Sequence, residues 1–335
     1  MTAIGDRPMV ALRDVWGQTL CALIDEDPRV VVLDGDLANS TKADMVAERY
    51  PARFLQMGIA EQNMAGVAAG LAAVGFVPWV SSFAVFLAER DLDQIRMTIA
   101  QTGLPVKLGA AYSGMLTGYT GKTHQSVEDI AIMRAMPRMT VIAPADAEEC
   151  RQAVRAATNL PGPVYFRLTR DPGPAVFDEG YRFEVGKGVA LREGGDVALI
   201  STGAQTTRAL AAADLLAAEG ISAYVLHLPT IKPLDEDAVV AAAARTGAVV
   251  TAEDHSILGG LGGAVAEALS ERRPTLMRRV GIRDTFGESG PNDALLEKYG
   301  LTARHVVEAA HDLLARRAHD TGHRASSVQA SPVDR

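Results

Sequence analysis

Short apolar runs alternate with longer segments of helical periodicity along most of this chain. The first series covers residues 30–33, 62–73, 76–80, 87–100, 106–108, 140–143, 147–157 and 164–168. A second, shorter series covers residues 197–200, 205–218, 222–228 and 248–251. Such alternation is typical of βαβ units, whose strands pair in a parallel sheet. The sequence therefore predicts an α/β fold of two domains, each a largely parallel sheet flanked by helices.

The length and a change of composition predict where the domains divide. A chain of 335 residues exceeds one ordinary domain. Residues 171–180 are rich in proline, glycine and acidic side chains, which is typical of a linker. We expect a first domain at residues 1–175, a linker at 176–190 and a second domain at 191–315. Residues 316–335 lose apolar periodicity, so we expect a disordered tail there.

Charge and cysteine content exclude several classes of function. The formal net charge is −8, and basic residues occur only in short pairs, so nucleic acid is not an expected partner. Cys21 and Cys150 lie in no spacing typical of a zinc or redox site, which indicates small core residues in a reducing compartment and no metal site. No signal-like or membrane-spanning apolar stretch occurs. We expect a cytoplasmic protein that does not bind membranes.

The most informative motif is Gly-Ile-Ala-Glu-Gln-Asn-Met-Ala at residues 58–65, which places Glu61 at the start of a small-residue helix. A glutamate at a helix N-terminus is also favoured by the macrodipole alone, whatever its function. Burial would raise the pKa of such a carboxyl, whereas the helix N-terminus and nearby N–H donors would lower it. From these residues alone, both a structural and a chemical role remain open.

Two further groups of residues favour a chemical role. Phe83 and Phe86 are three residues apart and can share one face of a turn, where they serve either as core or as a stacking surface. His124 lies in the glycine-punctuated loop at residues 118–129. A histidine in such a loop can lie at the edge of a site and titrate near neutral pH.

The motif at 58–65, the aromatic pair and the Thr-His-Gln run at 123–125 together resemble the transketolase family over roughly residues 11–313. The resemblance implies the family's pyrimidine-binding and C-terminal domains, with thiamine diphosphate as cofactor. It implies that Glu61 contacts the cofactor's pyrimidine nitrogen, that Phe83 and Phe86 flank the pyrimidine ring, and that His124 assists proton movement at the substrate carbonyl. The cofactor would carry the carbanion chemistry.

Further positions resemble the family's substrate contacts. Arg13, Ser40 and Arg170 match its sugar-phosphate contacts, and arginine offers paired donors suited to phosphate. Asp36 resembles a residue near the thiamine, and helix capping is its alternative role.

The chain departs from the family at two positions that bear on substrate specificity. Transketolases commonly carry a histidine twelve residues before the loop histidine, where this chain has Tyr112. They commonly carry an aspartate four residues before it, where this chain has Thr120. The resemblance therefore implies ketol transfer from a sugar phosphate or a modified ketose.

The resemblance lacks the family's diphosphate-binding half. Only Asp-Gly-Asp occurs at residues 34–36, without the asparagine that completes the family's magnesium and diphosphate site. We therefore expect a small subunit of a split transketolase, with Mg²⁺ or Ca²⁺ held by an N-terminal diphosphate-binding partner in an α2β2 assembly. The alternatives are the beta subunit of a 2-oxoacid dehydrogenase decarboxylating component, a non-catalytic scaffold subunit, and 1-deoxyxylulose 5-phosphate synthase chemistry, which normally uses one chain with both halves.

Overall fold

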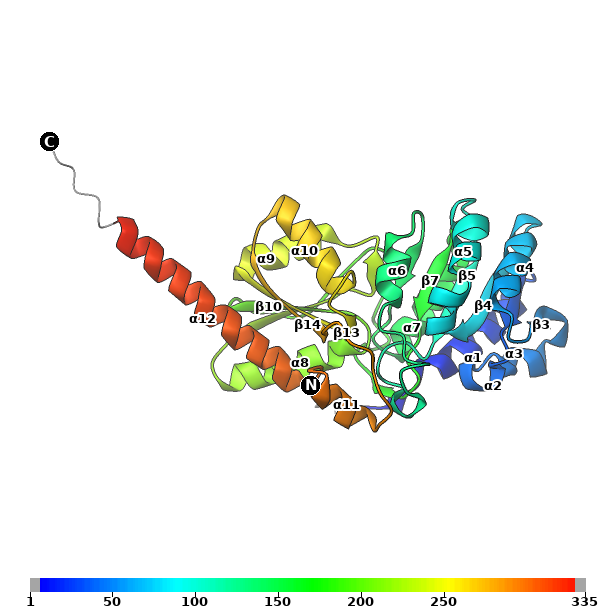
Figure 1. Ribbon diagram of the computed structural model, residues 1–335, viewed down its shortest axis with the longest axis horizontal. Coiled ribbons are helices and arrows are strands. Elements are labelled where there is room, and N and C mark those ends of the chain that lie inside the picture. Colours follow the sequence, from blue (N-terminus) through cyan, green and yellow to red (C-terminus); the bar gives the residue numbers. More distant parts are fainter. Residues whose placement is uncertain (1–6, 329–335) are drawn as a thin grey trace.

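A computed structural model describes residues 7–328, with side chains through residue 319. The helices and strands form two α/β units that lie beside each other, the N-terminal unit in blue to green and the C-terminal unit in green to red (Figure 1). Each unit is built on its own mostly parallel sheet. The predicted α/β fold with two helix-flanked sheets is confirmed.

The first sheet has seven strands in the order β12-β6-β7-β5-β4-β2-β3. Its strands are β2 (Val30–Asp34), β3 (Phe54–Gln56), β4 (Val77–Phe83), β5 (Lys107–Ala111), β6 (Thr140–Ile142), β7 (Val164–Arg167) and β12 (Thr230–Lys232). Successive residues of one strand enter opposite hydrophobic clusters: Val31 packs on one face and Val32 on the other. Both faces of the sheet are therefore buried, as expected for parallel strands.

Helices cover the two faces of this sheet. One face carries α1 (Leu12–Glu26), α2 (Ala38–Thr41), α3 (Asp44–Arg49), the short turn η2 (Pro51–Arg53) and α7 (Ala147–Asn159). The other carries α4 (Glu61–Ala73), η3 (Phe86–Arg90), α5 (Leu92–Gln94), η4 (Ile95–Ala100) and α6 (Asp129–Ala135). The turn η5 (Gly118–Thr120) lies in the loop after β5. This is the layered arrangement of a doubly wound sheet.

The second sheet has five strands in the order β14-β13-β10-β11-β9. They are β9 (Val189–Arg192), β10 (Val197–Ser201), β11 (Ala223–His227), β13 (Ala248–Ser256) and β14 (Leu276–Ile282). One face packs against α8 (Gln205–Ala218) and α12 (Ala303–Val328), and the other against α9 (Glu236–Thr246) and α10 (Leu261–Arg272). The short α11 (Asn292–Lys298) contacts η5 of the first unit.

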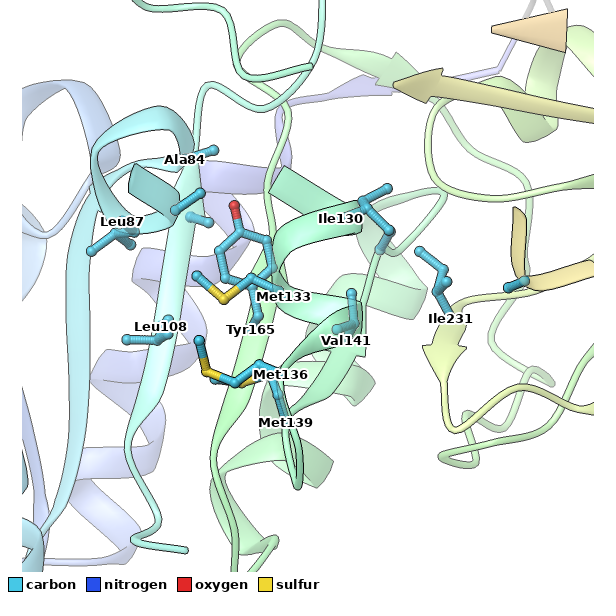
Figure 2. Close-up of a cluster of buried hydrophobic side chains, with 14 of the residues drawn as sticks. Ala84, Leu87, Leu108, Ile130, Met133, Met136, Met139, Val141, Tyr165 and Ile231 are labelled. Carbon is cyan, nitrogen blue, oxygen red and sulfur yellow. The ribbon is translucent and has the colours of Figure 1, made fainter. Parts of the chain in front are cut away.

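The two units share one hydrophobic core. Strand β12 comes from the C-terminal half of the chain but pairs antiparallel with β6 at the edge of the first sheet. Figure 2 shows Ile231 of β12 beside Val141 and Ile130, while Met133 points toward Tyr165. A third sheet has two strands, β1 (Met9–Val10) and β8 (Gly173–Pro174), which pair antiparallel and connect the N-terminal strand to the end of the first unit.

Two predictions differ from the structure. The helix predicted at residues 87–100 is interrupted at Asp91. This residue has a non-helical φ of −116° and ψ of 18°, and it lies between η3 and α5. The predicted tail at 316–335 differs as well, because α12 continues through Val328, while residues 329–335 lie outside the described part. The first turns of α12 pack in the core of the second unit, and packing of this kind stabilises a helix. Among the described residues, no helix is long and apolar enough to cross a membrane.

Asp91 predicts an unusual pH dependence of stability. Its side chain is fully buried, and neither carboxylate oxygen has a hydrogen-bond partner on another described residue. Burial, with a smaller contribution from the charge of Glu61, raises the pKa of Asp91 from 3.8 to about 8. Because the folded state then binds the proton more tightly than the unfolded state, the free energy of unfolding should fall as pH rises through this window, by at most about 1.4 kcal/mol per pH unit.

The variant Asp91→Asn should remove the contribution of Asp91 to the pH dependence of the free energy of unfolding, since an amide carries no charge at either pH. Urea denaturation of wild type and variant at about pH 5 and about pH 8 measures it. The exposed neighbour Asp93 provides a matched control, Asp93→Asn, which should keep the wild-type slope. Equal pH slopes for wild type and Asp91→Asn would contradict the prediction.

Candidate active site

Glu61 begins α4 and its side chain is fully buried. The Ser82 hydroxyl donates a hydrogen bond to Glu61 Oε1 at 3.2 Å, and Arg90 Nη1 donates to Oε2 at 2.7 Å. The Arg90 guanidinium also lies over the Phe86 ring, 4.2 Å from its centroid. These groups come from α4, β4 and η3, whose ends meet at one edge of the first sheet. The carboxylate is thereby held beside an aromatic surface.

Phe83, Phe86 and His124 form that aromatic surface. Phe83 ends β4 and Phe86 begins η3, and their ring centroids are 5.8 Å apart with planes at 21°. His124 meets both rings edge-on, with centroids 5.7 Å from Phe83 and 5.5 Å from Phe86. The imidazole is partly exposed, and Nδ1 lies 2.8 Å from the Thr123 hydroxyl. The imidazole therefore lies at the edge of the two phenylalanine rings and is accessible from solvent.

Tyr112 connects the aromatic surface to two arginines. Its ring stacks on Phe83 at 3.9 Å between centroids, and its φ of 60° is unusual for a bulky residue. Arg13 Nη1 donates to the Tyr112 hydroxyl at 3.2 Å and to the Ser40 carbonyl at 2.7 Å. The guanidinium carbons of Arg13 and Arg170 lie 5.7 Å and 5.5 Å from the ring centroid. We call Arg13, Tyr112 and Arg170 the arginine clamp.

The arginine clamp is suited to an anion. Hydrogen bonding to Tyr112, followed by the charge of Asp171, raises the pKa of Arg170, so its guanidinium stays charged. The Nε atoms of both arginines are buried without hydrogen-bond partners among the described residues. Ser40 contributes its carbonyl to Arg13, while its hydroxyl bonds to Asn39 at 3.3 Å. A phosphate or sulfonate would satisfy the free donors.

Two predicted residues lie at the margin of these groups. Asp36 is exposed with a φ of 68°, and its backbone N–H donates to Gln56 Oε1 at 3.0 Å. Asp36 does not cap a helix, because the N-cap of α2 is Leu37, whose own N–H donates to Asp34 Oδ1 at 2.7 Å. Thr120 donates to the Thr117 carbonyl at 2.6 Å within its own turn.

Other residues at the site carried no recognisable signal in the sequence. Ser82 and Arg90 both donate hydrogen bonds to Glu61. Ser82 is next to Phe83, which the sequence motifs selected, but nothing in the sequence near Arg90 indicates its contact with Glu61. Asp254 of β13 accepts the Met115 N–H at 2.9 Å and so anchors the loop that carries Thr120 and His124. Such contacts join segments far apart in the chain, and local spacing does not indicate them.

Comparison with known proteins identifies both units. Residues 8–174 match the family model "Transketolase, pyrimidine binding domain", and residues 186–306 match "Transketolase, C-terminal domain". The chain is 45% identical over 306 residues to 6-deoxy-6-sulfo-D-fructose transketolase subunit SqwH of Clostridium sp. (strain MSTE9), covering 91% of this chain and 95% of the relative. It is 35% identical to an apulose-4-phosphate transketolase subunit of Phocaeicola vulgatus, covering 92% of this chain and 99% of that relative.

A solved structure is also similar. "Split gene transketolase, inactive beta4 tetramer" is 49% identical with a TM-score of 0.86, covering 91% of this chain and 99% of that one. The transketolase from Leishmania mexicana shares the fold at 23% identity and a TM-score of 0.78, and this chain covers 48% of its length. Both domain models match this chain, and it covers almost the full length of relatives that are 35–45% identical to it. The chain therefore belongs to the transketolase family.

Proposed function

We propose that this chain is the small subunit of a heteromeric, thiamine-diphosphate-dependent transketolase that moves a two-carbon ketol unit from a ketose donor to an aldose acceptor. One observation carries the proposal: the buried carboxylate of Glu61 lies beside the Phe83, Phe86 and His124 rings, next to the arginine clamp. A carboxylate, an aromatic surface, an imidazole and an anion site are the parts such a reaction needs in one place.

The residues at the Glu61 carboxylate fit an aminopyrimidine. A Cβ on Gly35 would lie in van der Waals contact with Glu61 Oε1 at 3.5 Å and with the Ser82 hydroxyl and Met64 Cε at 3.4 Å, so any side chain at position 35 would occupy the space beside the carboxylate. Phe86, which lies under the Arg90 guanidinium, and Phe83 are the rings that we propose flank the pyrimidine. Thiamine diphosphate, when bound, supplies the carbanion chemistry of ketol transfer. Among the described residues, no group of three or more His, Cys, Asp or Glu side chains could hold a metal ion. A partner subunit would supply the ligands for Mg²⁺ or Ca²⁺.

Each residue then has a separate task. Glu61 holds a proton shared with the pyrimidine nitrogen of the cofactor. His124 donates a proton to, and recovers it from, the carbonyl oxygen of the sugar. Arg13 and Arg170 bind the anionic end of the ketose, and Tyr112 and Thr120 contribute to substrate specificity. Phe83 and Phe86 exclude water from the pyrimidine face.

The names of the relatives support a proposal for the partner and the donor. Two relatives are named as transketolase subunits and the similar solved structure as a split-gene transketolase. We infer an N-terminal diphosphate-binding partner and an α2β2 assembly. Because one relative is named for a sulfonated ketose and another for a sugar phosphate, both anion types are donor candidates.

Reconstitution tests the proposal. Thiamine diphosphate binding and ketol transfer are measured, with Mg²⁺ present, for this chain alone, for a subunit that carries the diphosphate-binding domain alone, and for their mixture. D-fructose 6-phosphate and 6-deoxy-6-sulfofructose serve as donors. We expect transfer only in the mixture. Turnover by the lone chain would contradict the need for a partner, and decarboxylation of 2-oxoacids by an assembled mixture without ketol transfer would contradict the reaction.

A further inference from the structure

Asn292, the first residue of α11, connects the second unit to both parts of the substrate site. Its side-chain Oδ1 accepts the Gly118 N–H at 2.8 Å, and its Nδ2 donates to Asp171 Oδ2. Asp171 in turn accepts from Arg170 Nη1 at 2.6 Å through its other oxygen. The amide orientation is determined, because a backbone N–H only donates and a carboxylate only accepts. One side chain thus joins the loop of Thr120 and His124 to the arginine clamp.

The packing around Asn292 leaves little freedom for this loop. The Gly290 N–H donates to the Gly118 carbonyl at 3.1 Å. A Cβ on Gly118 would lie 2.3 Å from the Gly290 carbonyl oxygen and 2.7 Å from Asn292 Oδ1, so backbone and amide are in direct contact. A shift of α11 would therefore move the loop of Thr120 and His124 and, at the same time, break the hydrogen bond from Asn292 to Asp171.

Asp171 determines where the Arg170 guanidinium lies. The ion pair between them is partly exposed, with 38% and 30% of the two side chains accessible, so Coulomb attraction alone would hold it weakly. The bond from Asn292 fixes the second Asp171 oxygen and leaves the first aimed at Arg170. Arg170 is then held over the Tyr112 ring, which Arg13 also approaches.

We propose that Asn292 is a positioning residue for the anionic end of the ketose, acting through Asp171 on Arg170 and through Gly118 on the His124 loop. The inference rests on the proposed function, because it assigns the arginine clamp to a substrate anion. Without Asn292, the Gly290–Gly118 and Met115–Asp254 hydrogen bonds still hold the loop of His124. No other described residue donates to Asp171 Oδ2, so the loss of Asn292 should weaken anion recognition more than the chemistry.

An exchange of residues tests the link without changing net charge. In the double variant Asp171→Asn/Asn292→Asp, the new amide at 171 can accept from Arg170 and donate to the new carboxylate at 292. That carboxylate can accept the Gly118 N–H. All three hydrogen bonds are kept, with the direction of the bond between 171 and 292 reversed and the negative charge moved to 292. In contrast, Asn292→Asp alone sets two carboxylates against each other, and Asn292→Ala removes both bonds.

The reconstituted complex is assayed with D-fructose 6-phosphate and with D-fructose, which lacks the anion. We expect Asn292→Ala to lower kcat/KM about tenfold for the phosphorylated sugar, mainly through KM, and less than about twofold for D-fructose. Asn292→Asp should lose more, and the exchanged double variant should recover to within about twofold of wild type. Thermal denaturation of each variant confirms folding.

Equal losses with both sugars, no loss with either, or no recovery in the exchanged variant would overturn the inference. Binding of inorganic sulfate to the assembled complex, measured by calorimetry, needs no turnover and separates this inference from the proposed function. Sulfate binding weakened about tenfold by Asn292→Ala and restored by the exchange supports the link even if no ketol transfer is found. Unchanged sulfate binding in Asn292→Ala, in a complex that transfers ketol units, overturns the link alone.

Discussion

Replacing Glu61 by glutamine is expected to lower ketol transfer by the reconstituted complex about a thousandfold, within the range for a lost proton-transfer group. Glutamine keeps the shape and can still accept from Ser82, but it cannot hold a shared proton or pair with Arg90 as an anion. The loss should appear in kcat and equally in kcat/KM, because the missing interaction belongs to the chemical step. Steady-state kinetics with saturating thiamine diphosphate measures it.

The exposed glutamate Glu48 supplies a control, and Glu48→Gln should leave all kinetic constants unchanged. Size-exclusion chromatography of Glu61→Gln with the partner shows whether assembly survives, which separates a catalytic defect from a failure to assemble. A Glu61→Gln complex that assembles and keeps more than about a tenth of the activity would contradict the assigned role.

Replacing Arg167 by methionine is expected to lower the free energy of unfolding by about 3–5 kcal/mol, because it leaves a buried carboxylate without its counter-ion. Arg167 donates to both oxygens of Asp129, at 2.8 Å and 3.0 Å, and to the backbone carbonyls of Ser126 and Asp254. Burial alone would raise the pKa of Asp129, but the charge of Arg167 holds it below its usual value. The pair joins β7 and α6 to β13. Urea denaturation at neutral pH measures the loss.

Two further variants define what the Arg167→Met result means. Arg272→Met removes a partner of Asp237 at the surface and should cost at most about 1 kcal/mol. The double variant Arg167→Met/Asp129→Leu should be less destabilised than Arg167→Met alone, since Asp129 no longer leaves an unpaired charge in the core. A loss below about 1 kcal/mol in Arg167→Met would mean that solvent or another group replaces the arginine.

The residues that the motifs selected are brought together by the fold. Glu61, Phe83, Phe86 and Tyr112 lie at the ends of β4, β5 and α4, and the carboxyl ends of parallel strands meet at one edge of a sheet. Motif order along the chain therefore predicts proximity, although the role of each residue stays a prediction until the variants are measured. Asp36 and Thr120 are the weaker choices, since their hydrogen bonds to Gln56 and Thr117 do not reach the aromatic surface or the arginine clamp.

The residues that hold the site in shape could not be found in the same way. Arg90 pairs with Glu61 from the last position of η3, just before the break at Asp91 that the predicted helix at 87–100 did not include. Asn292 is 121 residues from Asp171 and 174 residues from Gly118. No periodicity connects such distant positions, and each of these side chains, taken alone, resembles an ordinary surface residue.

The sequence by itself determined the fold class, the two parallel sheets and the family, because strand and helix periods and local motifs depend on neighbouring residues. Only the tertiary structure decided that β12 leaves the second unit to complete the first sheet, and that α12 continues through Val328. It also decided that Asp254 and Asn292 of the second unit hold the His124 loop. These outcomes depend on which apolar surfaces, distant in the sequence, are buried against each other, and on which buried polar groups form hydrogen bonds. Both are properties of the packed molecule.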